Sequence, residues 1–136
     1  GNTLTGIVIG APGFIYMFHV GDTRLYLFQK GNLSQLTRDH SIKSEKSFSF
    51  SSNALVNSMG GGIEKFYVDF QQISEKVHAG DLLLLSSDGL HGIISDDEIV
   101  EVLNMDTSLQ EKVQLLLQKA LHGGGYDNIT LVLLAF

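Results

Sequence analysis

The sequence predicts an α+β domain in which a largely antiparallel sheet carries its helices on one face. Two observations support this fold class. The first part of the chain alternates short β-branched and aromatic segments with glycine-containing turns, which is typical of strands. The last third carries two amphipathic segments with N-cap residues, which is typical of helices. With 136 residues, 43% of them hydrophobic, the chain has the size and composition of one globular domain with a buried core.

The strand predictions begin with a hairpin. Residues 4–9 and 14–20 flank a Gly-Ala-Pro-Gly turn and should pair with each other. Two further strands, 25–29 and 33–36, follow the Gly-Asp-Thr-Arg segment at 21–24. We therefore expect the first part of the chain to form a β-meander.

The middle of the chain is predicted to be a long loop. Between Asp39 and Met59 the sequence is rich in serine and has no regular period, so we expect a flap-like loop over about 40–59. Strands are expected again at 66–73 and 81–85. The unbroken leucine run of the second indicates a strand that is buried on both faces.

Two helices and a last strand complete the expected elements. Ser95 and Glu98 form a capping box at the start of the first helix. The second helix should begin at 107–108 and end at the glycines 123–125, and the last strand should cover 129–136. The second helix is expected to bury one apolar face, formed by Leu109, Val113, Leu116, Leu117 and Ala120.

Composition and charge exclude several classes of function. The chain has no cysteine, which excludes disulfide frameworks, zinc–thiolate sites and cysteine nucleophiles. The net charge of −6 comes without a cluster of Lys or Arg, so nucleic acid is not an expected partner. Apolar runs are far shorter than the roughly 20 residues that cross a bilayer, and no signal peptide is visible. We therefore expect a cytoplasmic protein that does not bind membranes.

Three aspartates stand beside glycine or asparagine at expected strand ends: Asp22, Asp88 and Asp127. Asp88 follows one strand and Asp127 precedes another, so both carboxylates lie at one edge of the sheet if those strands pair antiparallel. Converging carboxylates repel unless a cation joins them, and oxygen donors favour Mg²⁺ or Mn²⁺. The alternative is that each aspartate only supports its turn, as is common beside glycine or asparagine. Spacing alone does not separate the two interpretations.

Other candidate sites carry weaker signals. The glycine clusters at 60–62 and 123–125 lack the Lys-Ser/Thr ending of a phosphate-binding P-loop, and helix termination or close backbone approach explains them better. None of the histidines has the i,i+4 spacing of a helical metal site. No Gly-x-Ser-x-Gly elbow is present, which argues against a serine hydrolase.

Four motifs, in order, resemble those of a known family. Gly-Asp-Thr-Arg-Leu-Tyr-Leu at 21–27, followed by Leu-Thr-Arg-Asp-His-Ser at 36–41, resembles the central motif of the metal-dependent protein serine/threonine phosphatases, the PPM or type 2C family. Met-Gly-Gly at 59–61 is similar to the end of that family's flap. The segments 80–99 and 124–130 resemble its later and last motifs. The resemblance covers the whole chain.

The resemblance implies a layered α-β-β-α sandwich with mostly antiparallel sheets and helices packed outside. It also implies hydrolysis of phosphoserine and phosphothreonine in a phosphoprotein substrate, through a metal-activated water at a binuclear Mn²⁺ or Mg²⁺ centre. By position, Asp88 and Asp127 correspond to ligands of that centre, and Asp22 with Asp88 to ligands of an additional, weaker metal site. Arg24 and His40 correspond to structural residues.

The motifs with which the family begins are not in this sequence. Family members start with an Asn-Glu-Asp type strand and an Asp-Gly-x-Gly-Gly motif, which supply the bridging aspartate and further ligands. Residues 1–5 match a stretch that follows those motifs. We therefore expect residues 1–136 to be a single incomplete domain, with its N-terminal part missing and without a complete catalytic set.

This truncation has two expected consequences. The chain should be a phosphatase domain that is inactive alone, and the alternative is a catalytically dead phosphatase-like domain that binds or scaffolds a partner. The missing segment should also leave apolar surface and an unpaired strand edge, with 82–85 and 129–134 as candidates. We expect the chain to bind its missing segment or to self-associate.

Overall fold

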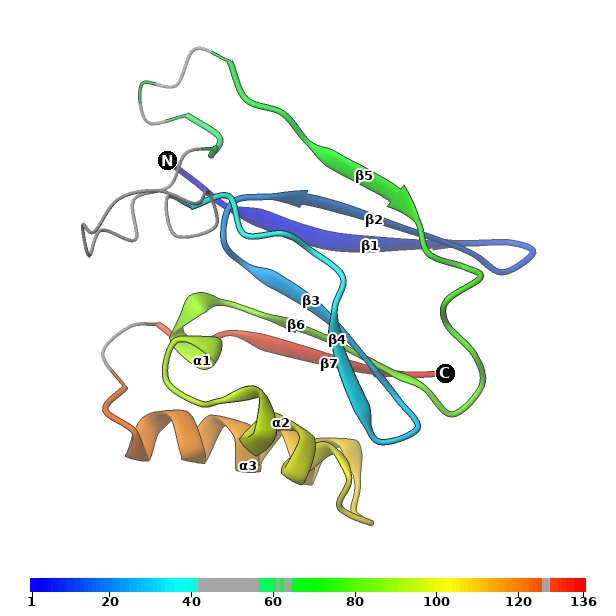
Figure 1. Cartoon of the computed structure of the whole chain (residues 1–136), viewed down its shortest axis with the longest axis vertical. Coiled ribbons are helices and arrows are strands. Elements are labelled where there is room, and N and C mark those ends of the chain that lie inside the picture. The colour runs from blue at the N-terminus through cyan, green and yellow to red at the C-terminus, as the bar shows by residue number, and fades with distance from the viewer. Residues whose placement is uncertain (42–56, 61, 63–64, 126–127) are drawn as a thin grey trace. The chain divides into compact units, whose positions relative to one another are not determined.

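The computed structural model describes residues 1–41, 57–60, 62, 65–125 and 128–136. The chain divides into two units, each with an antiparallel sheet of its own (Figure 1). Unit 1 consists of Gly1–Thr23 with Thr37–Lys76, and unit 2 of Arg24–Leu36 with Val77–Phe136. Within the described residues, no helix has the length and hydropathy needed to span a membrane.

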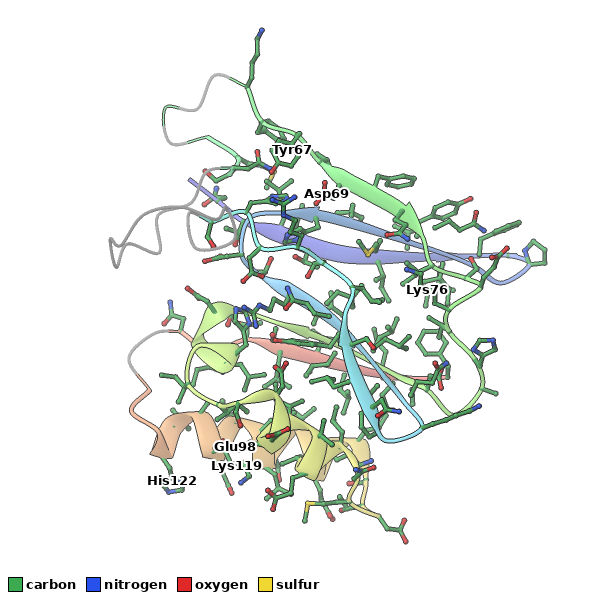
Figure 2. The ribbon with its side chains drawn as sticks, in the orientation of Figure 1. Tyr67, Asp69, Lys76, Glu98, Lys119 and His122 are labelled. Carbon is green, nitrogen blue, oxygen red and sulfur yellow. The ribbon has the colours of Figure 1, made fainter. Side chains whose placement is uncertain are left out.

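Unit 1 is built on a three-stranded sheet with the strand order β1-β2-β5. Strands β1 (Leu4–Gly10) and β2 (Phe14–Val20) form the predicted hairpin. Strand β5 (Asp69–Gln72) pairs with the other side of β2 and is shorter than the expected strand at 66–73. Figure 2 shows Tyr67 and Asp69 where the chain enters β5.

The buried face of β2 ends in a row of polar side chains. Ile15 and Met17 are buried apolar residues on this face, and the next position on it is His19, which is also buried. In the sheet register, His19 lies opposite Thr5 of β1 and opposite Asp69 of β5. Three polar residues are therefore neighbours across the sheet, near the point where β2 ends.

Unit 2 contains a four-stranded sheet with the order β4-β3-β6-β7. Strands β3 (Arg24–Gln29) and β4 (Asn32–Gln35) form a hairpin. Strand β6 (Leu82–Ser86) lies between β3 and β7 (Leu131–Ala135). Three of the four leucines of β6 are buried and the fourth is half-buried, which confirms a central strand covered on both faces.

Three helices lie between β6 and β7 in the sequence. The short α1 (Asp88–His91) was not expected, whereas α2 (Asp96–Leu103) and α3 (Leu109–His122) correspond to the two predicted helices. The Ser95 hydroxyl accepts a hydrogen bond from the backbone N–H of Glu98 at 3.2 Å, which confirms the predicted N-cap of α2.

Helix α3 begins after the N-cap residue Ser108, as predicted, but its buried face is narrower than expected. Leu116 and Ala120 are fully buried. Leu109 and Leu117 are 38% and 36% exposed, so their assignment to the buried face is wrong. Leu117 follows Leu116 by one residue, which places it about 100° further round the helix.

The core of unit 2 lies between one face of the sheet and the helices (Figure 1). Alternate residues of β3 and β6 supply the strand side of this core, as the period of two requires. Its buried members are Tyr26, Phe28, Leu82, Leu84, Leu90, Ile94, Ile99, Val102, Leu103, Leu116 and Ala120. The prediction that the helices gather on one face of a sheet is therefore confirmed for this unit.

The predicted meander is wrong, because β2 and β3 do not pair. Strand β2 pairs with β1 and β5, and β3 pairs with β4 and β6, so the chain changes sheet at residues 21–23. Gly21 has a φ angle of +108°, and a Cβ atom there would lie 2.3 Å from Cγ2 of Thr3. A turn within a sheet and a turn between sheets use the same residue types, so local sequence could not separate them.

The expected strand edge at 82–85 is also wrong, because β6 has a partner on each side. Strand β7 has one partner among the described strands, and its Val132 is 50% exposed. Of the two candidate segments, 129–134 is therefore the one that contains an edge strand.

Substitution of Gly21 tests the change of sheet. We predict that Gly21→Ala lowers the free energy of unfolding by about 1 to 2 kcal/mol for the left-handed φ angle and by a further amount because Thr3 must move. Gly13→Ala is the matched control, since Gly13 has a φ of +101° and a Cβ atom there would meet no other part of the chain within 4 Å. Urea denaturation of both variants measures the difference. Equal losses would contradict a close approach at Gly21.

Candidate functional site

The three aspartates predicted as metal ligands are distributed over both units. Asp22 is half-buried in the turn that follows β2, in unit 1. Asp88 is exposed and is the first residue of α1, in unit 2. Asp127 lies outside the described residues. The adjacency of the Asp88 and Asp127 carboxylates therefore stays a prediction.

The condition on which that prediction depends is confirmed, because β6 and β7 pair antiparallel. The contact continues beyond the strands: the Ser87 N–H donates to the Thr130 carbonyl at 2.9 Å, and the Thr130 N–H donates to the Ser87 hydroxyl at 2.9 Å. The same hydroxyl donates to the Asn128 carbonyl at 3.3 Å. The residue before Asp88 is thus bound to the residue after Asp127.

Gly89 adds a close backbone contact at the same place. A Cβ atom at Gly89 would lie 2.2 Å from the carbonyl oxygen of Asn128, so no larger residue fits without displacing that backbone. The start of α1 therefore packs directly against the segment that follows Asp127. Glycine at position 89 is therefore needed for this close packing, in addition to any role in the turn.

The donors available at these positions suit a hard divalent cation. Asp22 and Asp88 offer carboxylate oxygens, and the chain has no cysteine to offer a softer ligand. Mg²⁺ and Mn²⁺ prefer oxygen ligands of this kind. Each of these carboxylates therefore offers the kind of ligand that the expected metals prefer.

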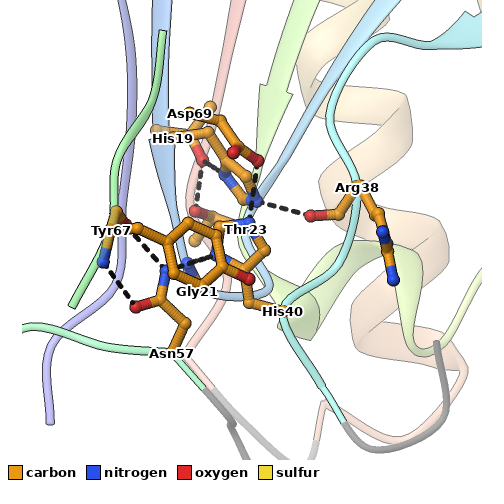
Figure 3. Close-up of polar contacts among 9 residues, drawn as sticks. His19, Gly21, Thr23, Arg38, His40, Asn57, Tyr67 and Asp69 are labelled. Carbon is orange, nitrogen blue, oxygen red and sulfur yellow. Dashed lines mark hydrogen bonds and ion pairs between the residues drawn. The ribbon is translucent and has the colours of Figure 1, made fainter. Parts of the chain in front are cut away.

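A group of side chains that could bind a metal lies in unit 1, and no motif in the sequence predicts it. Three potential ligand atoms, one from each of His19, His40 and Asp69, lie within 4.8 Å of one another (Figure 3). Both histidines are buried, and their ring centroids are 4.5 Å apart. The i,i+4 criterion finds pairs on one helix only. This cluster depends on the strand register, which sets His19 opposite Asp69 and cannot be read from spacing along the sequence.

Protein groups occupy both ring nitrogens of His19. Its Nε2 lies 2.8 Å from the Arg38 carbonyl oxygen, and its Nδ1 lies 2.8 Å from the Thr5 hydroxyl. A carbonyl can only accept, so the proton of His19 is assigned to Nε2, and Nδ1 accepts from Thr5. The Thr5 hydroxyl is in turn hydrogen-bonded to that of Thr23.

Protein groups also occupy both ring nitrogens of His40. Its Nδ1 lies 3.0 Å from the backbone nitrogen of Gly21 and 2.8 Å from Nδ2 of Asn57, and its Nε2 lies 2.8 Å from Oδ2 of Asp69. The Asn57 amide is oriented by Tyr67, whose N–H donates to Oδ1 and whose carbonyl accepts from Nδ2. Both partners of Nδ1 are therefore donors.

The proton of His40 is consequently assigned to Nε2, which donates it to Asp69. The contact joins Nε2 of His40 to Oδ2 of Asp69 over 2.8 Å. Among the described residues, no buried side-chain nitrogen or oxygen lacks a partner. The cluster is complete as a hydrogen-bonded network without a metal ion.

Titration of His19 should make the stability of the protein depend on pH. Burial is the largest cause that lowers the pKa of His19 below its ordinary value of 6.5, and the coulombic effect of His40 lowers it further. The hydrogen bond to the Arg38 backbone and the charges of Asp69 and Asp39 raise the pKa but do not outweigh these causes. Below about pH 6.5 the unfolded chain therefore binds a proton that the folded chain does not. The free energy of unfolding should be highest above that pH and fall as the pH drops toward the lowered pKa, by at most about 1.4 kcal/mol per pH unit.

Urea denaturation at about pH 7.5 and about pH 5.5 measures this effect. His19→Gln should be less stable at the higher pH but should lose less stability on acidification than the unaltered chain. His122→Gln, at the exposed last residue of α3, is the control (Figure 2). An unaltered pH dependence in His19→Gln would assign the effect to other groups.

Comparison with known proteins gives relatives over nearly the whole chain, although no protein-family model matches it. The serine/threonine protein phosphatase PstP of Mycobacterium tuberculosis is 34% identical over 142 aligned residues, which cover 97% of this chain and 27% of PstP. The structure of the S. agalactiae serine/threonine phosphatase matches with a TM-score of 0.86 and 29% identity, over 98% of this chain and 59% of that one.

A third relative is described with metal ions. The catalytic domain of PstP in complex with two manganese ions matches with a TM-score of 0.77 and 32% identity, over 96% of this chain and 56% of that one. The chain thus spans about a quarter of full-length PstP and just over half of the phosphatase structures. These matches and the two antiparallel sheets with their helices confirm the predicted α+β fold class. Over nearly its whole length the chain is similar to the metal-dependent (PPM, type 2C) protein serine/threonine phosphatases, and it corresponds to part of their domain.

Proposed function

We propose that this chain is part of a protein serine/threonine phosphatase domain that hydrolyses phosphoserine and phosphothreonine in phosphoprotein substrates. The observation that supports this best is the contact between the ends of β6 and β7. There, Ser87 and Gly89 are held against Asn128 by hydrogen bonds and close packing. The two motifs that resemble those of the phosphatases are therefore brought to one edge of the sheet.

The proposed metal ligands are Asp22, Asp88 and Asp127, with Mn²⁺ or Mg²⁺ as the metal. Such ions, when bound, acidify a water molecule and offset the negative charge of the phosphoryl oxygens. The hydroxyl of Ser87 binds both Asn128 and Thr130, so it restrains the two chain segments that carry Asp88 and Asp127.

This set is proposed to be incomplete for catalysis. The family resemblance places the bridging aspartate in an Asp-Gly-x-Gly-Gly motif, and this sequence has no such motif. A catalytically dead domain that binds a partner is the alternative, and the coverage of just over half of the phosphatase structures is compatible with it. An in-frame Asp-Gly-x-Gly-Gly upstream in the parent coding sequence would favour the enzyme, and its absence would favour the binding domain.

Metal binding and turnover by the chain can be measured separately. We predict that Mn²⁺ broadens the amide NMR signals of Asp22 and Asp88, and that Asp88→Asn weakens the effect at Asp88. We also predict hydrolysis of a phosphothreonine peptide far below about 1 per second, the lower end of ordinary enzyme rates. Asp106→Asn, at an exposed position of the α2–α3 connection, is the matched control and should change neither measurement.

The two readouts contradict different parts of the proposal. Turnover between about 1 and 1000 per second that Asp88→Asn abolishes would show that the chain is catalytically complete. Absence of any Mn²⁺ effect at both aspartates would remove the proposed metal site itself.

One face of the sheet in unit 1 is proposed to bind a second copy of the chain. Val8, Phe14 and Phe70 are 55%, 42% and 67% exposed and lie on the same face as Tyr16. The ring of Tyr16 stacks with those of Phe14 and Phe70, at centroid distances of 6.3 and 5.4 Å. Soluble monomers rarely expose large contiguous apolar patches, and symmetric dimers are the commonest way to cover one.

Sedimentation equilibrium at micromolar concentration tests this association. We predict a dimer for the unaltered chain and a shift toward monomer for Phe70→Ser, because the substitution removes the most exposed ring of the face. Leu121→Ser, at a 56% exposed position of α3, is the control and should leave the dimer intact. A monomeric unaltered chain would show that the aromatic face needs no partner.

A further inference from the structure

We propose that His40 is a positioning residue for Asp22, that it acts through the backbone of Gly21, and that Asp69 selects the tautomer of His40 on which this depends. The inference rests on the proposed function, in which Asp22 is a metal ligand. All four residues belong to unit 1.

The first step is that His40 binds both backbone polar groups of Gly21. The His40 N–H donates to the Gly21 carbonyl at 2.8 Å, and the Gly21 N–H donates to Nδ1 of His40 at 3.0 Å (Figure 3). The Gly21 carbonyl belongs to the planar peptide group that ends at the Cα of Asp22. The orientation of this carbonyl therefore fixes the positions of the backbone N and Cα atoms of Asp22. Glycine at a φ of +108° has wide conformational freedom, which these two bonds restrict.

The second step is that Nδ1 of His40 can accept only while the proton is on Nε2. Asp69 favours this state from the other side of the ring, because its carboxylate accepts from Nε2 at 2.8 Å. Carboxylates orient metal-binding histidines in the same way, by fixing the tautomer from behind the ring. Here the histidine holds the backbone beside a proposed ligand instead of holding the metal.

The third step is that the His40 ring has little freedom to turn. Its centroid lies 4.5 Å from that of His19 and 4.7 Å from that of Tyr67. The Asn57 amide adds a second donor to Nδ1 at 2.8 Å and is itself bound to the backbone of Tyr67. His40 is 2% exposed, so water does not compete freely for these bonds.

Two substitutions separate the two sides of the His40 ring. His40→Asn keeps an acceptor at the position of Nδ1 and loses the contact with Asp69, whereas His40→Gln keeps a donor toward Asp69 and loses that acceptor. Asp69→Asn removes the charge that selects the tautomer, at a side chain that is 42% exposed and can therefore hydrogen-bond to water. His122→Gln is the exposed control.

Three measurements on the full chain test the proposal. Hydrogen exchange of the Gly21 amide should become at least about 10-fold faster in His40→Gln and stay near the unaltered rate in His40→Asn. The ¹⁵N spectrum of the imidazole should show the Nε2–H tautomer, and a tautomer mixture in Asp69→Asn. The Mn²⁺ concentration that broadens the Asp22 amide should rise about 10- to 100-fold in His40→Gln.

The possible failures have different meanings. If His40→Gln loses protection at Gly21 but Asp22 responds to Mn²⁺ as in the unaltered chain, the positioning role is wrong and the proposed metal site stands. If Asp22 of the unaltered chain does not respond while Asp88 does, Asp22 is not a ligand and the positioning role fails with it. If His40→Gln does not fold, His40→Asn and Asp69→Asn still decide, because an unchanged tautomer in Asp69→Asn overturns the role of Asp69.

Discussion

The hydrogen bonds between His40 and Gly21 are the interaction on which the path of the chain through unit 1 depends. Gly21 is buried and lies beyond the last paired residue of β2, so no strand supplies partners for its N–H and carbonyl. Leaving a buried polar group without a partner costs about 1 to 3 kcal/mol. His40 satisfies both groups, one with its backbone and one with its ring. The chain can therefore leave one sheet at Gly21 and enter the other at Arg24 without that cost.

The two described aspartates of the proposed metal site share a structural arrangement. Each follows a residue whose backbone or side chain is held by a distant segment: Gly21 before Asp22 by His40, and Ser87 before Asp88 by Thr130. In both places the partner lies at least 19 residues away in the sequence. The backbone that leads into each aspartate is thus held by tertiary hydrogen bonds.

The His19, His40 and Asp69 cluster shows why a geometric grouping of ligands is not by itself a metal site. Its nitrogens are close enough to share an ion, yet each has a protein donor or acceptor that matches its protonation. Binding a metal there would require the loss of at least one such bond to each histidine. Burial lowers the pKa of His19, so its imidazole stabilises the protein most when it is neutral.

The amino-acid sequence by itself determined the strands, the N-caps at Ser95 and Ser108, the buried run of β6 and the resemblance to the phosphatases. Each of these depends on residues within a few positions of one another, through side-chain period, capping hydrogen bonds or short motifs. Tertiary structure alone decided that β2 and β3 belong to different sheets, that Leu117 is exposed, and that His19 and His40 meet Asp69. These features depend on strand register and on contacts between segments far apart in the chain, and a one-residue change of register would place His19 on the opposite face.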